Sequence, residues 1–515
     1  MNPLDLLVRE SVQNSLDAAV DAAVNVDFRF GELDAADVLS CLGESQVTKR
    51  MAGRGLSRRF LEIRDTGTSG LTGPTSLKEL ALTPGSDHGN ILKLIYEIGR
   101  ARADTTAGGA WGLGKTVYYR VGCGLTLFYS RIREGKGYAE RLAACLVEDE
   151  READRFQDES ATGVGWWGAK GGGPITDTPT VRKLLSKLGI APFGENETGT
   201  AVFIPFLRND LRPSGDAPWS SNDADFIRVA LQRWYCIRLD NEHFASGAKL
   251  TARVDGRPVK RFDMLPLFKV TQALYLRAIG RTGPDLLTLV APTANAQVEP
   301  VVGVRTVVAA KSVGTLAAVR LTPSDLKMTP PDNNPHPALA ALGLVPDGGA
   351  PLVAFIRRHG MIIRWDHRTD AKGWSKGVSI EEDKHAVALF VPTQTALHEQ
   401  LLRDLKWKEG TLDAYLRSCE MADHHQWTDP AGITVVSRIR SKVSDILRSY
   451  LTPVAPTMTT SPLLAARELA DRLLPRGFGS DGRHGPPAAE ETPSGPTKLA
   501  KSSDFAFTVT NLEFE

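Results

Sequence analysis

Apolar positions near the start of the chain recur at the spacing of an amphipathic helix. They are Leu4, Leu7, Val8, Val12, Leu16 and Val20. In the same segment Glu10, Asn14 and Asp17 are four and three residues apart, so a helix places them within roughly 60° of one face. A carboxylate there can polarise a water molecule, and an amide oxygen can bind a hard cation such as Mg²⁺. Taken alone, the segment is better explained as the solvated face of a helix.

Two further segments predict short strands that adjoin tight turns. Residues 60–63 are largely apolar and lead to Asp65 and Gly67. A carboxylate at a strand end can accept a hydrogen bond from an adenine amino group, and a glycine lets the ring approach the backbone. Residues 197–205 form a Gly-Thr turn that enters an apolar strand. Each segment by itself is also explained by an ordinary turn or strand start.

Residues 108–116, GGAWGLGKT, match two nucleotide-binding patterns at once. The first is the complete G-x-x-x-x-G-K-[ST] pattern of a P-loop, which requires a buried strand directly before it. Residues 100–107, RARADTTA, contain no β-branched apolar run and therefore do not predict that strand. The second pattern, G-x-x-G-x-G at Gly109, Gly112 and Gly114, is thus the stronger interpretation.

The motifs E-x-x-x-N-x-x-D-A, D-x-G, G-x-x-G-x-G and G-T follow one another along the chain. Their order and spacing resemble the GHKL ATPase superfamily of gyrase B, the related heat-shock chaperone, histidine kinases and MutL. The resemblance covers residues 1–208. It implies an α/β fold that begins with a Bergerat-type sandwich, a domain that binds ATP and Mg²⁺.

The resemblance also implies roles for individual residues. Glu10 is expected to be the general base, and Asn14 both the magnesium ligand and a nucleotide contact. Asp65 is expected to read the adenine, with Thr200 supporting both the carboxylate and the base. Asp17 completes the nucleotide-binding face of the helix.

The glycine-rich segment would form the phosphate side of the site. Gly109, Gly112 and Gly114 are expected to close over the phosphates, at the end of a mobile lid that spans residues 71–108. Lys115 follows at the start of a helix, where an accessory phosphate contact and a solvated lysine are equally good interpretations.

Two departures from the superfamily pattern change the expectation. Gly67 is expected under the adenine, but Ser69 stands where many members have a second glycine, so the adjacent Gly70 is left out of the expected site. Glu10 lies close to Met1, so the N-terminal arm that many relatives exchange between subunits is not expected here. Arm-exchanged dimerisation is therefore in doubt, while other ATP-driven pairing is not.

Beyond residue 208 the composition changes. We expect an α/β transducer-like domain over 209–394, a helical region over 395–451, a flexible linker over 452–502 and a terminal strand over 503–515 that needs a partner sheet or starts a further β domain. Strand-like runs occupy 249–254, 301–308, 316–321 and 352–365. Superfamily members of the gyrase, MutL and chaperone branch send a basic residue from this domain to the γ-phosphate. The candidates are Lys327, Arg357, Arg358 and Lys372.

Composition narrows the classes of protein. Lys and Arg number 62 and Asp and Glu 61, which argues against a globally basic nucleic-acid binder but not against a local basic patch. The five cysteines form no C-x-x-C pair, which argues against a zinc site and a disulfide framework. No signal peptide or long apolar run is evident, so a cytoplasmic protein without membrane insertion is expected.

Three functions fit these motifs. The first is an ATP-hydrolysing switch that couples lid closure to the transducer-like domain, and the second is a non-hydrolysing, ATP-dependent scaffold in a multi-protein complex. A histidine kinase is disfavoured because no phosphoacceptor helix pair precedes the ATPase motifs. The third motif is similar to that of bacterial stand-alone and MORC-type members, which suggests anti-phage defence or DNA-linked processes. A protein partner or a homodimer is expected, and DNA is left open as a partner.

Overall fold

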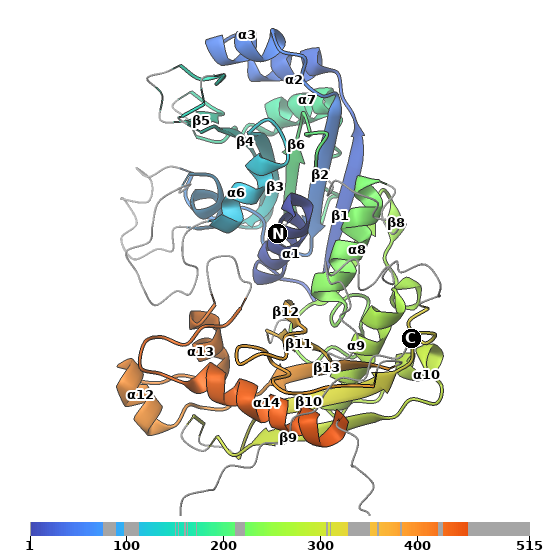
Figure 1. Ribbon diagram of the computed structural model, residues 1–515. Helices are drawn as coiled ribbons and strands as arrows, with labels where there is room; N and C mark the ends of the chain where they lie inside the picture. The colour runs from blue at the N-terminus through green and yellow to red at the C-terminus, as the bar shows by residue number, and fades with distance from the viewer. Residues whose placement is uncertain are drawn as a thin grey trace, which may run out of the picture. The chain divides into compact units, whose positions relative to one another are not determined.

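Two mixed β-sheets, each packed against helices, organise the chain in the computed structural model (Figure 1). The structure describes residues 2–451 except 76–88, 97–112, 150, 153, 159–160, 162, 171–172, 212–221, 305–306, 309–310, 328–350, 358–359, 382–383 and 421–425. The expected mixed α/β class is confirmed. The predicted linker over 452–502 and the terminal strand over 503–515 lie outside the described residues.

The first sheet has eight strands in the order β5-β4-β3-β6-β2-β1-β7-β8. They are β1 (Ala23–Glu32), β2 (Arg59–Thr66), β3 (Leu125–Glu134), β4 (Gly137–Val147), β5 (Val164–Trp167), β6 (Gly199–Ile204), β7 (Lys249–Val254) and β8 (Arg257–Pro258). Neighbouring strands are antiparallel except β1 and β7, which pair in parallel from Ala23 with Lys249 to Phe28 with Val254. The predicted strand over 249–254 is therefore confirmed, and it belongs to the same sheet as the N-terminal motifs.

Helices cover both faces of this sheet because alternate strand residues point to opposite sides. On β6, Val202 packs in the cluster that includes α1 (Pro3–Asp17), α6 (Leu113–Arg120) and α8 (Asp223–Tyr235). The next residue, Phe203, packs in a second cluster with α2 (Ala35–Leu42), α3 (Gln46–Ala52) and α7 (Thr178–Leu188). The predicted N-terminal helix is confirmed, with the Asn2 side chain accepting a hydrogen bond from the Leu4 N–H at 2.8 Å as its N-cap.

The second sheet has five strands in the order β12-β11-β13-β10-β9. They are β9 (Ala296–Val302), β10 (Ser312–Leu321), β11 (Leu352–Ile356), β12 (Ile362–Asp366) and β13 (His385–Pro392). Helix α9 (Pro266–Ala278) packs against β13 and β10, and α14 (Val435–Leu451) packs against β9 and β10. The shorter helices of this part are α10 (Leu286–Val290), α12 (Glu399–Leu405) and α13 (Leu412–Ser418), with a 3₁₀ turn at Arg261–Asp263.

Most of the predicted elements in this part are found, with one shift. The run 352–365 forms the antiparallel pair β11–β12, and 316–321 lies within β10. The run 301–308 is mostly wrong as a strand, because β9 ends at Val302 and Gly303 follows with a φ of +85°. The apolar residues after this turn, Val304, Val307 and Val308, are buried without belonging to a strand.

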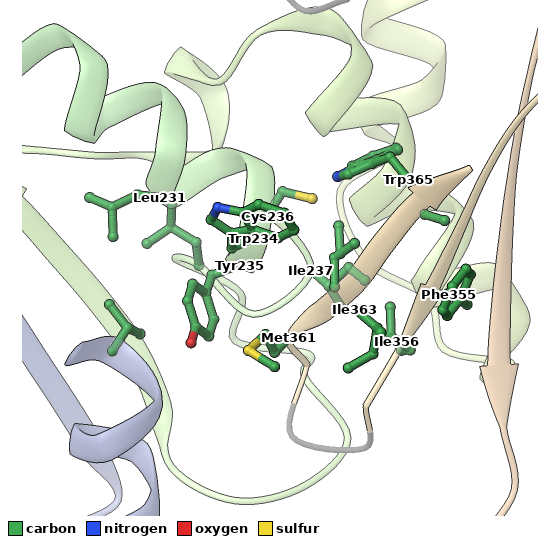
Figure 2. Packing of buried hydrophobic residues seen from close by; sticks show 14 of the residues in the cluster. Leu231, Trp234, Tyr235, Cys236, Ile237, Phe355, Ile356, Met361, Ile363 and Trp365 are labelled. Atoms are coloured by element: carbon green, nitrogen blue, oxygen red, sulfur yellow. The ribbon is translucent and has the colours of Figure 1, made fainter. Parts of the chain in front are cut away.

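Apolar side chains join α8 to the β11–β12 hairpin. Trp234 and Tyr235 of α8 lie near Met361, Ile363 and Trp365 of the hairpin (Figure 2). The Trp365 indole N–H donates to the Arg233 carbonyl at 3.1 Å, which fixes the orientation of the ring. The hairpin therefore packs on the helix that also covers the first sheet.

Ile363 is fully buried in this contact, so its removal tests how much the packing stabilises the fold. We expect Ile363→Ala to lower the free energy of unfolding by about 2–5 kcal/mol, because the residual cavity adds to the lost burial. Urea denaturation measures the change. Leu289→Ala, at a residue that is 64% exposed, is the control and is expected to stay within about 0.5 kcal/mol of the parent. Equal losses in the two variants would contradict this role of the hairpin.

Candidate functional site

A cavity of about 230 Å³ lies between helix α1, strands β2 and β6, and a short helical segment. That segment consists of α5 (Gly89–Ile91) and a π-helical turn, η1 (Leu92–Tyr96). Helix α6 contributes Tyr118 to the wall. Among the described residues, the cavity therefore brings together side chains from the first helix motif, the Asp65 turn and the Gly-Thr turn.

Asp65, near the end of β2, lines this cavity, and three groups hold its carboxylate. The Thr68 hydroxyl donates to Oδ1 at 2.5 Å, and the Thr200 N–H donates to the same oxygen at 3.0 Å. The Ser15 hydroxyl of α1 donates to Oδ2 at 2.9 Å. Burial raises the pKa of the Asp65 carboxyl above its usual value, although these donors act in the opposite direction. The carboxylate is thus fixed in orientation.

The exposed rim of the cavity is formed by the C-terminal turn of α1. Asn14 and Asp17 both line the cavity and are both exposed. The Asn14 amide nitrogen donates to the Tyr118 hydroxyl at 3.2 Å, which orients the amide against α6. Among the described residues, no group of three or more His, Cys, Asp or Glu side chains is placed to hold a metal ion.

Glu10 lies one helical turn before Asn14 but does not line the cavity. Its side chain is buried, with 5% of the residue exposed. Burial raises the pKa of the Tyr118 hydroxyl, and the negative charges of Glu10 and Asp65 raise it further. The charge of Glu10 therefore acts on Tyr118, a residue of the cavity wall, although Glu10 itself does not line the cavity.

Two glycines shape the turn after β2. Gly70 lines the cavity at a φ of +68°, and a Cβ there would lie 2.6 Å from the Ser130 hydroxyl and 2.9 Å from the Gly199 carbonyl. Gly67 has a φ of +79°, and a Cβ there would lie only 2.1 Å from the Ala23 carbonyl oxygen. Gly67 does not line the cavity, so the glycine at the wall is Gly70, which the motif had left out.

The α5–η1 segment, part of the predicted lid, forms one wall. The Asn90 side chain donates to the Gly70 carbonyl at 3.2 Å, and Lys93 also lines the cavity. From the edge strand β5, the Trp166 indole N–H donates to the Ile95 carbonyl at 3.1 Å. The segment is thus held both at the cavity and at the edge of the sheet.

The glycine-rich motif is only partly within the described residues. Gly109 and Gly112 lie outside them. Helix α6 begins at Leu113, so Gly114 and Lys115 stand in its first turn, as expected from the sequence.

The four basic candidates of the second sheet lie in different places. Arg357 is buried and forms an ion pair with Glu420. Desolvation lowers the pKa of Arg357, but the hydrogen bonds and the charge of Glu420 outweigh it and raise the pKa. The charge of Asp17 also raises it. Arg358 lies outside the described residues. Lys327 lies near Lys269, whose lowered pKa is due to burial and to the charge of Lys327. Lys372 lies beside α14, where its carbonyl accepts a hydrogen bond from Arg440.

Sequence reasoning missed several residues that line the cavity or hold Asp65. Ser11 and Ser15 lie on the buried face of α1, at positions where the helical pattern predicts apolar residues. Small polar residues at such positions were a signal that could have been used. Thr68 follows Asp65 by three residues in the turn, and this spacing could have indicated a local hydrogen bond between the two side chains. Tyr118 gave no signal, because nothing in its local pattern places it opposite α1.

Comparison with protein families found no model that matches the chain, and comparison with curated proteins found no significant match. No helix in the described ranges is long and apolar enough to cross a membrane. The geometry of the cavity is therefore the observation from which a function is inferred.

Burial raises the pKa of Asp65 and hydrogen bonding lowers it. The pH dependence of the free energy of unfolding shows which effect is larger. Because the folded-state pKa is raised, the folded protein binds the proton more tightly than the unfolded chain, and stability is lost as the pH rises above about 4. Asp65→Asn lacks this titration, so we expect it to be less destabilising near pH 7 than near pH 4. Urea denaturation at both pH values measures this. A larger cost near pH 7 would show that the donors depress the pKa instead.

Proposed function

We propose that this protein binds ATP in the cavity beside Asp65 and hydrolyses it as a conformational switch. The observation that carries the proposal is the carboxylate of Asp65, fixed by Ser15, Thr68 and Thr200 at the wall of a cavity whose rim carries Asn14 and Asp17. This combination of a fixed acceptor and a polar helix face suits a ligand with an amino-bearing ring and a charged end.

The cavity itself would take the adenine. A carboxylate accepts a hydrogen bond from the exocyclic amino group of adenine, and guanine has a carbonyl oxygen at that position. Ile63, Leu71, Leu94 and Val202 give the cavity apolar walls. Its volume, about 230 Å³, lies below the roughly 300–1,000 Å³ typical of sites that enclose a whole ligand. The phosphates would thus extend from the cavity over the rim.

The phosphate end would lie where α1 and the start of α6 meet. The N-terminus of a helix attracts phosphate through its backbone N–H groups, and Lys115 stands in the first turn of α6. Lys93 supplies a further cation at the wall. Asn14 would hold Mg²⁺ through its amide oxygen, and the ion would neutralise charge on the phosphates when bound.

Glu10 is the proposed general base. It lies on the face of α1 that carries Asn14, one turn away, so a small rearrangement at the rim brings its carboxylate toward water beside the phosphates. The burial of Glu10 behind the cavity wall also favours a second candidate, an ATP-dependent scaffold that does not hydrolyse the nucleotide. Turnover distinguishes the two.

Helix α1 also connects the proposed site to the second sheet. The fully buried Arg9 donates to the Ile363 carbonyl at 3.4 Å, and the Tyr235 hydroxyl of α8 donates to the Arg9 carbonyl at 2.6 Å. Asp17 at the rim raises the pKa of Arg357 in the hairpin loop. A change in α1 on nucleotide binding would therefore reach the hairpin directly.

Replacing Asp65 tests the adenine contact. We expect Asp65→Ala to weaken ATP binding by roughly 10- to 100-fold, because a hydrogen bond to a charged group contributes about 1.5–3 kcal/mol. Calorimetric titration with ATP and GTP measures the affinity, and the parent is expected to prefer ATP. Asp154→Ala, at a side chain that is 90% exposed, is the control with unchanged affinity. Equal binding of ATP and GTP by the parent would contradict the assignment of Asp65.

Replacing Glu10 tests the mechanism. We expect Glu10→Gln to lower kcat for ATP hydrolysis by roughly 10²- to 10⁴-fold while the affinity for ATP is retained. Phosphate release measures turnover, and Glu44→Gln, at an exposed residue, is the matched control. Turnover of Glu10→Gln at the parental rate would rule out the proposed base. ATP binding without turnover in the parent would establish the scaffold function instead.

A further inference from the structure

We propose that helix α14 and the loop that precedes β13 form a surface that binds the phosphate backbone of duplex DNA. The surface is defined by residues 369–377 of the loop and by α14 (residues 435–451). It carries six basic side chains, Lys372, Lys376, Arg438, Arg440, Lys442 and Arg448. The same two segments contain only two carboxylates, Asp370 and Asp445. The whole chain has a net charge of +1, so this surface concentrates positive charge that the rest of the molecule balances.

The helix separates an apolar side from a basic side. Val435, Ile439, Val443 and Leu447 are buried and follow the spacing of one helix face. The opposite face exposes Arg438, Lys442 and Arg448, together with the hydroxyl-bearing residues Ser441 and Ser449. Asp445 is exposed on this face too and pairs with Arg448 at 3.1 Å and with Lys442 at 4.0 Å, so the basic side chains outnumber the carboxylate there by three to one. Hydroxyl groups and basic side chains are the groups that proteins use to contact phosphate oxygens and sugars.

Hydrogen bonds fix the loop against this helix. The Ser444 hydroxyl donates to the Trp374 carbonyl at 2.9 Å and accepts from the Lys376 N–H at 3.1 Å. The Arg440 guanidinium donates to the Lys372 carbonyl at 3.1 Å, and that of Arg448 donates to the Lys376 carbonyl at 2.8 Å. Backbone groups of the two lysines make these contacts, while their side chains are exposed. The lysines are thus held beside the helix with their charges directed to solvent.

The chemistry of the surface favours a duplex over other anionic partners. The large apolar side chains that are exposed in the described residues all lie elsewhere, whereas membrane-binding helices insert Trp, Phe or Leu into the lipid. The surface also lacks the exposed aromatic rings on which the bases of single strands stack. Arg438 and Arg448 are about 15 Å apart along the helix, a length over which duplex DNA presents on the order of nine phosphates.

The test removes three of the charges without touching the loop's hydrogen bonds. In the variant Lys372→Gln/Lys376→Gln/Lys442→Gln, the backbone contacts of the two loop lysines remain, and Lys442 loses its 4.0 Å ion pair with Asp445. The matched control, Lys136→Gln/Lys183→Gln/Lys187→Gln, removes the same charge from exposed residues of the first sheet and α7. Binding of a fluorescent mixed-sequence duplex by the full chain is followed by anisotropy over a range of salt concentrations, without nucleotide.

We expect the α14 variant to bind the duplex at least tenfold more weakly than the parent. The slope of log affinity against log salt should become shallower by roughly two to three, because each lost phosphate contact removes about 0.9. The control should keep the parental affinity and slope. Equal losses in both triple variants, or stronger parental binding to single strands, phosphatidylserine vesicles or polyglutamate than to duplex, would overturn the proposal. ATP affinity is compared between the parent and the double variant Lys376→Gln/Lys442→Gln, which keeps the γ-phosphate candidate Lys372, so a failure here stays distinct from a failure of the proposed nucleotide site.

Discussion

The burial of two charged side chains of helix α1 against α8 is the interaction on which the arrangement of the fold depends. Asp5 forms an ion pair with Arg233 at 2.5 Å and accepts from the Trp234 indole at 3.1 Å. The Arg9 guanidinium lies 4.8 Å from the centre of the Trp234 ring. Charges buried to this extent are stable only with partners in a defined geometry. These buried charges therefore fix the position of α1 on the sheet. Apolar packing alone would define that position less precisely.

The position of α1 in turn decides where the cavity lies. Its serines face β2, so Ser15 reaches Asp65, while the antiparallel neighbours β2 and β6 bring Asp65 and Thr200 together across 135 residues of sequence. The carboxylate is pulled in two directions, since burial disfavours its charge and three donors favour it. A ligand that offers one more donor would change that balance in favour of the charged form.

Local patterns predicted a good part of this architecture. The helical period identified α1, and the apolar runs identified β7 and the β11–β12 hairpin, because each of these elements is encoded by a short continuous segment. The partners of these elements were not predictable in this way. The pairing of β7 with β1, the ion pair of Arg357 with Glu420, and the contact of Tyr118 with Asn14 all join distant segments. Gly70, and not the expected Gly67, lies at the cavity wall because of the geometry of the turn, and the spacing of the motif does not encode that geometry.

The parallel pairing of β1 with β7 has a consequence for how the chain can be made or divided. During synthesis, the edge of β1 that pairs with β7 stays unpaired until Val254 has left the ribosome. Asp5 likewise lacks its ion-pair partner until Arg233 has been synthesised. An uncovered strand edge is a template for pairing with other chains. Excision of residues 1–208, the segment that carries all the nucleotide-binding motifs, would expose that edge and leave Asp5 without its cation. The smallest piece that keeps these contacts extends past the predicted boundary to β7, so the motif-bearing segment and the foldable unit have different lengths.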